Sequence, residues 1–224
     1  MDENWPPRFY GASSAMRLPA CDDGQIRSKR INRMINRLHQ LLLITTFVPL
    51  CWLLTQAVHE LGHVAVAYAT SGTVSKVVLY PTTISRTDTS GSLQPTLVVW
   101  AGPAIGIALP LVLLAFFKAA KLRWDYLVQF FAGMCLIANG AYIGVGSLVR
   151  IGDAGDLIRE GSPIWFLWLF GILTVPLGFG LWNGLGPSFG LGSARGKVDW
   201  MAAWLSVVLL AVVVALEMVF SSSQ

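Results

Sequence analysis

Five long apolar stretches, separated by short polar segments, dominate the hydrophobic pattern of the chain. Each has roughly the 20 residues that a helix needs to cross the hydrocarbon core of a bilayer. The stretches cover approximately residues 41–69, 94–117, 125–149, 163–185 and 199–220. The pattern therefore predicts an all-α polytopic membrane protein with about five transmembrane helices.

The segment between the first two apolar stretches, Gly72 to Ser92, has a different pattern. It begins with β-branched residues at 74, 77 and 78 and continues into a Thr-rich sequence that ends in Ser90-Gly91. This composition is typical of a short strand or a hairpin. Such backbone is tolerated at membrane depth only where protein or a watery cavity covers it. We therefore expect a short membrane-associated β-strand or hairpin after the first helix.

The first forty residues differ in composition from the rest of the chain. Residues 1–26 are polar and irregular, which predicts a disordered tail. A basic stretch follows, with Arg27, Lys29, Arg30, Arg33 and Arg37. Such a stretch serves as a topology anchor or as a lipid or partner site. We therefore divide the chain into a disordered tail with a basic juxtamembrane stretch, residues 1–40, and a single transmembrane domain, residues 41–224.

The basic residues also predict the orientation of the helices. They are concentrated at 27–37 and in the loops 118–124 and 186–198. If the chain crosses the membrane five times, these three segments lie on the same side. The loop 150–162, on the opposite side, has charges of both signs. By the positive-inside rule, we expect a multi-pass protein of the inner (plasma) membrane. Its N-terminus then lies in the cytoplasm and its C-terminus outside.

The composition is typical of a membrane protein and does not indicate a soluble domain, a nucleic-acid-binding protein or a disulfide-rich protein. The chain is 54% hydrophobic and 12% charged, whereas soluble domains contain about 25% charged residues. The net charge of +4 is confined to short loops and does not indicate a nucleic-acid partner. The three cysteines, Cys21, Cys51 and Cys135, have no metal-binding spacing and predict no disulfide framework.

The end of the first apolar stretch contains the motif His59-Glu60-Leu61-Gly62-His63. Positions i and i+4 share one face of a helix, so both imidazoles can bind one zinc ion at about 2.0–2.1 Å. Glu60 can then act as general base on a water activated by the metal. The uncharged run 41–58 spans about 27 Å as a helix, which places the motif at or just inside the far membrane face. The alternative, two histidines satisfied by neighbouring helices, leaves Glu60 and the spacing unexplained.

A catalytic zinc site needs a third protein ligand. The remaining histidine, His39, precedes His59 by 20 residues, about 30 Å along a helix, and therefore cannot bind the same ion. The predicted orientation leaves carboxylates on the outer side as candidates. They are Asp88, Asp153, Asp156 and Glu160.

HELGH at the end of a first apolar span resembles the site-2 protease family of intramembrane zinc metalloproteases. Ala101-Gly102-Pro103 resembles the A-G-P motif of that family, and the 72–92 segment resembles its membrane-associated β-hairpin. Asn139, followed by Gly152-Asp153, resembles the pattern of an Asn upstream of the Asp that is the third zinc ligand. The resemblance covers about residues 41–163.

Two departures from the family pattern indicate a divergent branch, similar to small bacterial peptidase-like members. The family commonly has Asn-x-x-Pro and then Asp-Gly. Here Asn139 is followed by Gly140-Ala141-Tyr142, and Asp153 is followed by Ala154.

The resemblance implies a zinc ion held by His59, His63 and Asp153, with Glu60 as the catalytic base. Asp156 is the alternative third ligand, because Gly-Asp-x-x-Asp also suits a helix start in which one aspartate caps the backbone. Asn139 is expected to bind substrate or to support a ligand. The implied activity is intramembrane cleavage of a transmembrane segment of another membrane protein within the lipid bilayer. The alternative is a non-catalytic, metal-binding membrane scaffold or regulator of the same fold.

Overall fold

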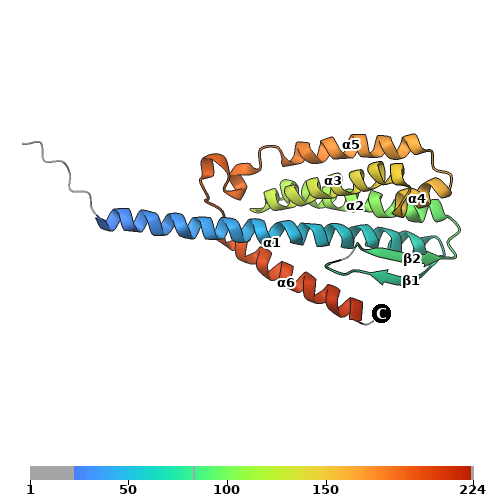
Figure 1. Cartoon of the computed structure of the whole chain (residues 1–224), viewed down its shortest axis with the longest axis horizontal. Coiled ribbons are helices and arrows are strands. Elements are labelled where there is room, and N and C mark those ends of the chain that lie inside the picture. Colours follow the sequence, from blue (N-terminus) through green and yellow to red (C-terminus); the bar gives the residue numbers. More distant parts are fainter. Residues whose placement is uncertain (1–22, 83, 223–224) are drawn as a thin grey trace, which may run out of the picture.

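The computed structural model describes residues 23–82 and 84–222 (Figure 1). Its elements in chain order are α1 (Asp23–Ala69), β1 (Thr73–Val78), β2 (Arg86–Ser90), α2 (Pro95–Ala119), α3 (Asp125–Val149), α4 (Gly152–Arg159), α5 (Ile164–Trp182), the 3-10 turns η1 (Gly186–Phe189) and η2 (Gly192–Ala194), and α6 (Trp200–Ser222). Within the described residues, α1, α2, α3, α5 and α6 are long and apolar enough to cross a membrane. The predicted fold class is thereby confirmed.

Helix α1 begins at Asp23, inside the segment that the sequence predicts to be a disordered tail with a basic stretch. The predicted disordered tail, residues 1–26, therefore overlaps the helix at residues 23–26; residues 1–22 lie outside the described part of the chain. The physical reason is cooperativity, because adding a turn to an existing helix needs no new nucleus. The basic stretch also contains four Arg and one Lys, which are good helix formers.

The helices pack in two groups around the long α1. Helices α2 and α6 lie against α1, and α5 packs along α3 (Figure 1). Small residues let α3 and α5 approach closely, because a Cβ at Gly171 would lie only 2.8 Å from the carbonyl oxygen of Gly140. The α3–α5 pair thus forms a rigid support for the segment that follows α3.

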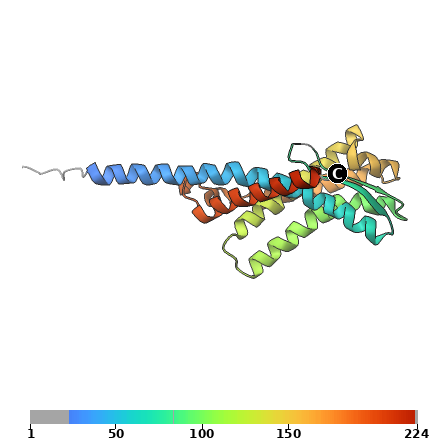
Figure 2. The same ribbon diagram turned by 90° about the horizontal axis from the view of Figure 1, so that it is seen from below.

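The 72–92 segment forms the expected hairpin. Strands β1 and β2 pair antiparallel, with Val77 opposite Thr87. Both views place this hairpin and α4 at the same end of the bundle, opposite the start of α1 (Figure 1, Figure 2). This end of the bundle also contains the C-terminal part of α1, and therefore the HELGH motif.

Helix α4 is held at that end by the turn after α3. Arg150, with φ of 55°, ends α3 in the left-handed region, and Gly152 adopts φ of 53° at the start of α4. Ala154 and Leu157 on α4 are fully buried against Ile143 of α3. The packing fixes the polar face of α4 toward α1.

Candidate metal centre

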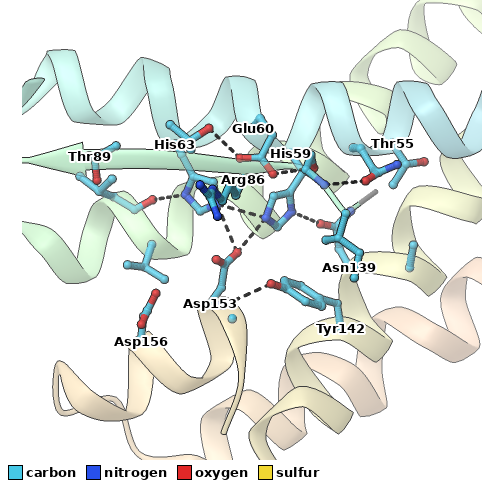
Figure 3. A pocket seen from close by; sticks show the side chains of 18 of the residues that line it. Thr55, His59, Glu60, His63, Arg86, Thr89, Asn139, Tyr142, Asp153 and Asp156 are labelled. Carbon is cyan, nitrogen blue, oxygen red and sulfur yellow. Dashed lines mark hydrogen bonds and ion pairs between the residues drawn. The ribbon is translucent and has the colours of Figure 1, made fainter. Parts of the chain in front are cut away.

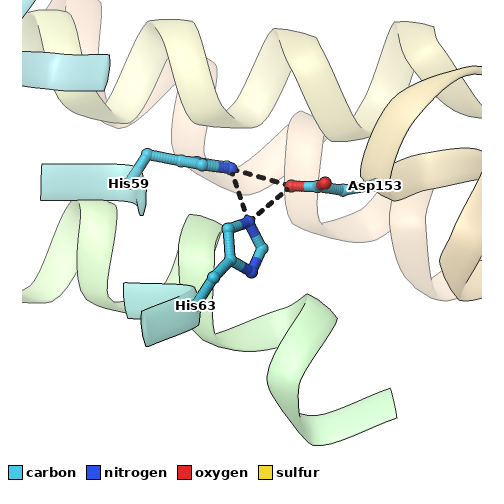
Figure 4. Close-up of side chains that lie close together, drawn as sticks. All are labelled: His59, His63 and Asp153. Atoms are coloured by element: carbon cyan, nitrogen blue, oxygen red, sulfur yellow. Dashed lines mark hydrogen bonds and ion pairs between the residues drawn. The ribbon is translucent and has the colours of Figure 1, made fainter. Parts of the chain in front are cut away.

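His59 and His63 lie one turn apart on α1, and both are buried. Their Nε2 atoms are 3.1 Å apart. Asp153 comes from α4, 94 residues after His59, and its Oδ2 lies 2.7 Å from His59 Nε2 and 3.2 Å from His63 Nε2 (Figure 4). Three potential ligand atoms from two helices therefore meet at one point.

The outer nitrogen of each imidazole has its own acceptor. His59 Nδ1 donates to Asn139 Oδ1 at 2.6 Å, and Asn139 presents its oxygen because its amide nitrogen donates to the Cys135 carbonyl at 2.9 Å. His63 Nδ1 donates to the Val98 carbonyl at 2.8 Å. A neutral imidazole with its proton on Nδ1 has a free lone pair on Nε2. Both Nε2 lone pairs therefore point to the same place.

Asp153 supplies a negative charge at this meeting point. Its burial opposes ionisation, but the adjacent imidazoles of His59 and His63 outweigh burial and hold the pKa of Asp153 well below its usual range. Asp153 is therefore a carboxylate, which is the form that binds a metal.

The three residues fit a zinc ion. Their ligand atoms all lie within 4.8 Å of one another. A tetrahedral site with ligands at about 2.0 Å has edges of about 3.3 Å, close to the distances found here. Two neutral imidazoles and one carboxylate also form a known type of catalytic zinc site. The group is thus able to hold a metal ion.

Two other carboxylates of the predicted set, Asp156 and Asp88, line the same cavity but do not join the group of converging atoms. Asp156 borders the same cavity but is ion-paired with Arg159 on the exposed side of α4. Asp88 lies on β2, where its Oδ1 is 3.6 Å from Arg86 Nε. Among the described residues, the group that converges on one point contains Asp153 and neither of these carboxylates.

Glu60 is buried beside the histidines and points to the hairpin (Figure 3). Its Oε1 accepts a hydrogen bond from Ser85 Oγ and its Oε2 accepts one from Thr87 Oγ1, both at 2.6 Å. The backbone N–H of Ser85 also donates to Gln56 Oε1 at 2.9 Å. These hydroxyls were not predicted from the sequence, where the recurrence of Ser or Thr at positions 85, 87 and 89 was the available signal.

Two glycines allow the HELGH segment of α1 and the A-G-P segment of α2 to pack in close contact. A Cβ at Gly62 would lie 2.8 Å from the carbonyl carbon of Ala101, so α1 and α2 are in backbone contact there. A Cβ at Gly102 would lie 2.7 Å from His59 Nε2 and would overlap His63 Nε2. Gly102 therefore leaves the space in which the two imidazoles meet.

Tyr142 is a further residue of the site that was not predicted from the sequence. Its hydroxyl oxygen accepts the backbone N–H of Asp153 at 3.3 Å, and its ring packs edge-on against His59. A Cβ at Gly152 would collide with this hydroxyl, so the glycine is needed for the close approach. Tyr142, at the position where the family pattern has Pro, thus ties the start of α4 to α3.

A cavity of about 580 Å³ opens beside the three ligand atoms (Figure 3). Residues 84–89 of the hairpin form one wall, and Asn139, Tyr142 and Asp153 lie on another. Strand β2 thus borders the cavity, whereas no residue of β1 is among those that line it. The cavity is large enough for an extended peptide segment of a few residues.

Comparison with known proteins gives a family match over just under half of the chain. Residues 37–145 match the family described as Peptidase M50B-like, which confirms the resemblance to the site-2 protease family. The match includes HELGH, Ala101-Gly102-Pro103 and Asn139, and it ends before Asp153. No curated protein and no solved structure matches the chain. The assignment of Asp153 therefore depends on the geometry of this structure.

Proposed function

We propose that this Peptidase M50B-like chain is an intramembrane zinc metalloendopeptidase that cleaves a transmembrane segment of another membrane protein. The observation that supports it best is the convergence of His59, His63 and Asp153 on one point, with Glu60 beside them. A membrane helix bundle gains nothing in stability from burying these groups unless they bind or react, because burial of ionisable side chains is costly.

When bound, a zinc ion supplies the Lewis acidity that lowers the pKa of a water and polarises the scissile carbonyl. The residues of the chain have separate tasks. His59, His63 and Asp153 hold the metal, and Asn139 and the Val98 carbonyl orient the two imidazoles. Glu60 takes a proton from the attacking water and delivers it to the leaving amine. The buried site keeps bulk water away from these groups.

The substrate needs a locally extended backbone, since the hydrogen bonds of a helix shield the scissile amide. The hairpin is suited to bind such a segment by strand addition. Of its two strands, β2 borders the cavity, whose wall includes residues 84–89. We therefore assign the docking edge to β2, and we assign Asn139, on the facing wall, to the substrate side of the cavity as well as to His59.

The same proposal includes the orientation in the inner membrane. The basic residues of α1 lie at the end of the bundle opposite the metal centre, together with the loop that carries Arg195 and Lys197 (Figure 1). With that end in the cytoplasm, the N-terminus is cytoplasmic and the C-terminus lies outside. Cleavage then takes place near the outer face of the membrane.

The variant Glu60→Gln tests the proposal in purified protein reconstituted into vesicles. The substrate is a set of single-span membrane segments, each with a fluorophore pair across the span. Wild type should hold about one zinc per chain and cleave one or more segments, whereas Glu60→Gln should keep the zinc and lose cleavage by about 10²-fold or more. Cleavage by Glu60→Gln at the wild-type rate would exclude Glu60 as base. Zinc without any cleavage in wild type would favour the metal-binding scaffold instead.

A further inference from the structure

The hairpin holds the carboxylate of Glu60 by both oxygens. Ser85 donates to Oε1 and Thr87 donates to Oε2, each at 2.6 Å. Glu60 is only 4% exposed, and among the described residues it forms no ion pair within 4 Å. The two hydroxyls are therefore the groups that fix the direction of this carboxylate.

The backbone of the hairpin explains why two hydroxyls reach one carboxylate. Residues two apart in an extended segment point to the same side, so Ser85, Thr87 and Thr89 face one way. Pairing of Thr87 with Val77 holds β2 in register, and the bond from Ser85 N–H to Gln56 Oε1 fastens the start of the strand to α1. The hairpin thus docks on the turn of α1 that runs from Gln56 to Glu60.

The arrangement leaves Glu60 able to react. A carboxylate has about four acceptor positions, and the two hydroxyls occupy two of them. The remaining positions can accept the proton of a water. Without the hydroxyls, three side-chain torsions of Glu60 become free, and the oxygens lose their fixed distance from His59 and His63. A displacement of about 1 Å is enough to reduce a rate by about 100-fold.

We propose that Ser85 and Thr87 are positioning residues that hold Glu60 in its reactive orientation, so that the base is set only while the hairpin is docked on α1. The inference rests on the proposed function, in which Glu60 is the general base. It links the substrate cavity to the group that moves the proton, since β2 borders the cavity and also carries Thr87, which bonds Glu60.

The kinetic test uses Ser85→Ala, Thr87→Val and the double variant in the vesicle assay. We expect kcat to fall about 10-fold in each single variant and about 100-fold in the double variant, with KM and zinc content unchanged. Ser85→Thr and Thr87→Ser keep a hydroxyl and should retain most of the activity. Ser75→Ala is the matched control, because it removes a hydroxyl of the same hairpin that bonds the Asp88 carbonyl on β2 and does not line the cavity.

A second measurement does not depend on activity. Hydrogen exchange of residues 84–90 in the purified protein reports whether the hairpin stays docked. Glu60→Ala and the double variant should both raise the exchange rate of this segment by about tenfold or more. Glu60→Gln should leave it close to wild type, because the amide can accept one hydroxyl proton and donate to the other hydroxyl oxygen.

The outcomes separate this inference from the proposed function. An active Glu60→Gln variant would overturn both. An inactive Glu60→Gln variant combined with wild-type kcat in the double variant would overturn only the role of Ser85 and Thr87. A rise in KM with unchanged kcat, or an equal loss in Ser75→Ala, would assign the hydroxyls to hairpin structure and also overturn it.

Discussion

Polar groups differ in burial between the two ends of the helix bundle. The metal end contains His59, Glu60 and His63, and the basic end contains Arg123 and Asp199. At the metal end, His59, Glu60 and His63 are 8%, 4% and 7% exposed, and each is bonded by a group from another segment. At the basic end, the ion pair between Arg123 and Asp199 has side chains that are 64% and 15% exposed. Water can therefore replace a lost partner at the basic end far more easily than at the metal end.

This difference in burial predicts where the chain is sensitive to substitution. Loss of one partner from a buried polar group leaves the other unsatisfied and costs about 1–3 kcal/mol, more where charge is involved. An exposed ion pair contributes about 0–1 kcal/mol. We therefore expect function to fail at the metal end and stability to change only slightly at the basic end. Four substitutions test the contrast.

Asp153→Ala should have the largest effect, because it removes one of the three converging ligand atoms. Loss of a residue that only supports a ligand typically lowers metal affinity by about 10- to 100-fold. We expect Asp153→Ala, which removes a ligand itself, to lower zinc affinity by more than this. Asp156→Ala is the matched control on the same helix, and it should change affinity little. Chelator competition measures both. Equal effects of the two substitutions would contradict the assignment of Asp153.

Gly102→Ala should come next. Its Cβ would occupy the space of both Nε2 atoms, so α2 must move from α1 or the imidazoles must turn away. Zinc content of the purified variant should drop well below one per chain. Gly180→Ala on α5 provides the control, since its Cβ would meet no atom within 4 Å. Full zinc occupancy in Gly102→Ala would show that the two helices are not in fixed contact.

Asn139→Ala should weaken zinc binding by about 10- to 100-fold, because His59 Nδ1 loses its acceptor and the ring its orientation. Asn139→Asp keeps an oxygen there and should bind more tightly than the alanine variant. Gln129→Ala, also on α3, removes a bond to the Leu181 carbonyl far from the metal and should leave affinity unchanged. The same chelator titration decides, and an unchanged affinity in Asn139→Ala would remove the residue from the metal centre.

Asp199→Asn should have the smallest effect. Asp199 bonds Trp124, the backbone N–H of Met201 and Arg123 at the start of α6. Partial burial opposes its ionisation, but these bonds outweigh it and lower the pKa of Asp199. Its contribution, about 1 kcal/mol, is therefore present above the unfolded pKa of about 3.9 and is lost as pH falls through the lower folded value.

Thermal unfolding in detergent checks this last prediction. Wild type should exceed Asp199→Asn in melting temperature at pH 7, and the difference should shrink as pH falls below the unfolded pKa of about 3.9. Zinc content at pH 7 should be the same in both proteins. A loss of zinc in Asp199→Asn would mean that the metal end and the basic end of the bundle are energetically coupled.

The sequence by itself determined the features that depend on neighbouring residues. Apolar run length fixes the five membrane helices, because the thickness of the bilayer sets how many residues a span needs. Helical periodicity places His59 and His63 on one face, since four residues make about one turn. The composition of 72–92 likewise predicts the hairpin without knowledge of its partners.

Only the tertiary structure decided how distant segments meet. The choice between Asp153 and Asp156 depends on how α4 packs under Ile143, and no local pattern contains that information. The contacts of Glu60 with Ser85 and Thr87 join residues 25 and 27 positions apart, and His59 meets Asp153 across 94. Local propensity specifies a helix or a strand, but the positions of side chains across the bundle follow from the packing of whole elements.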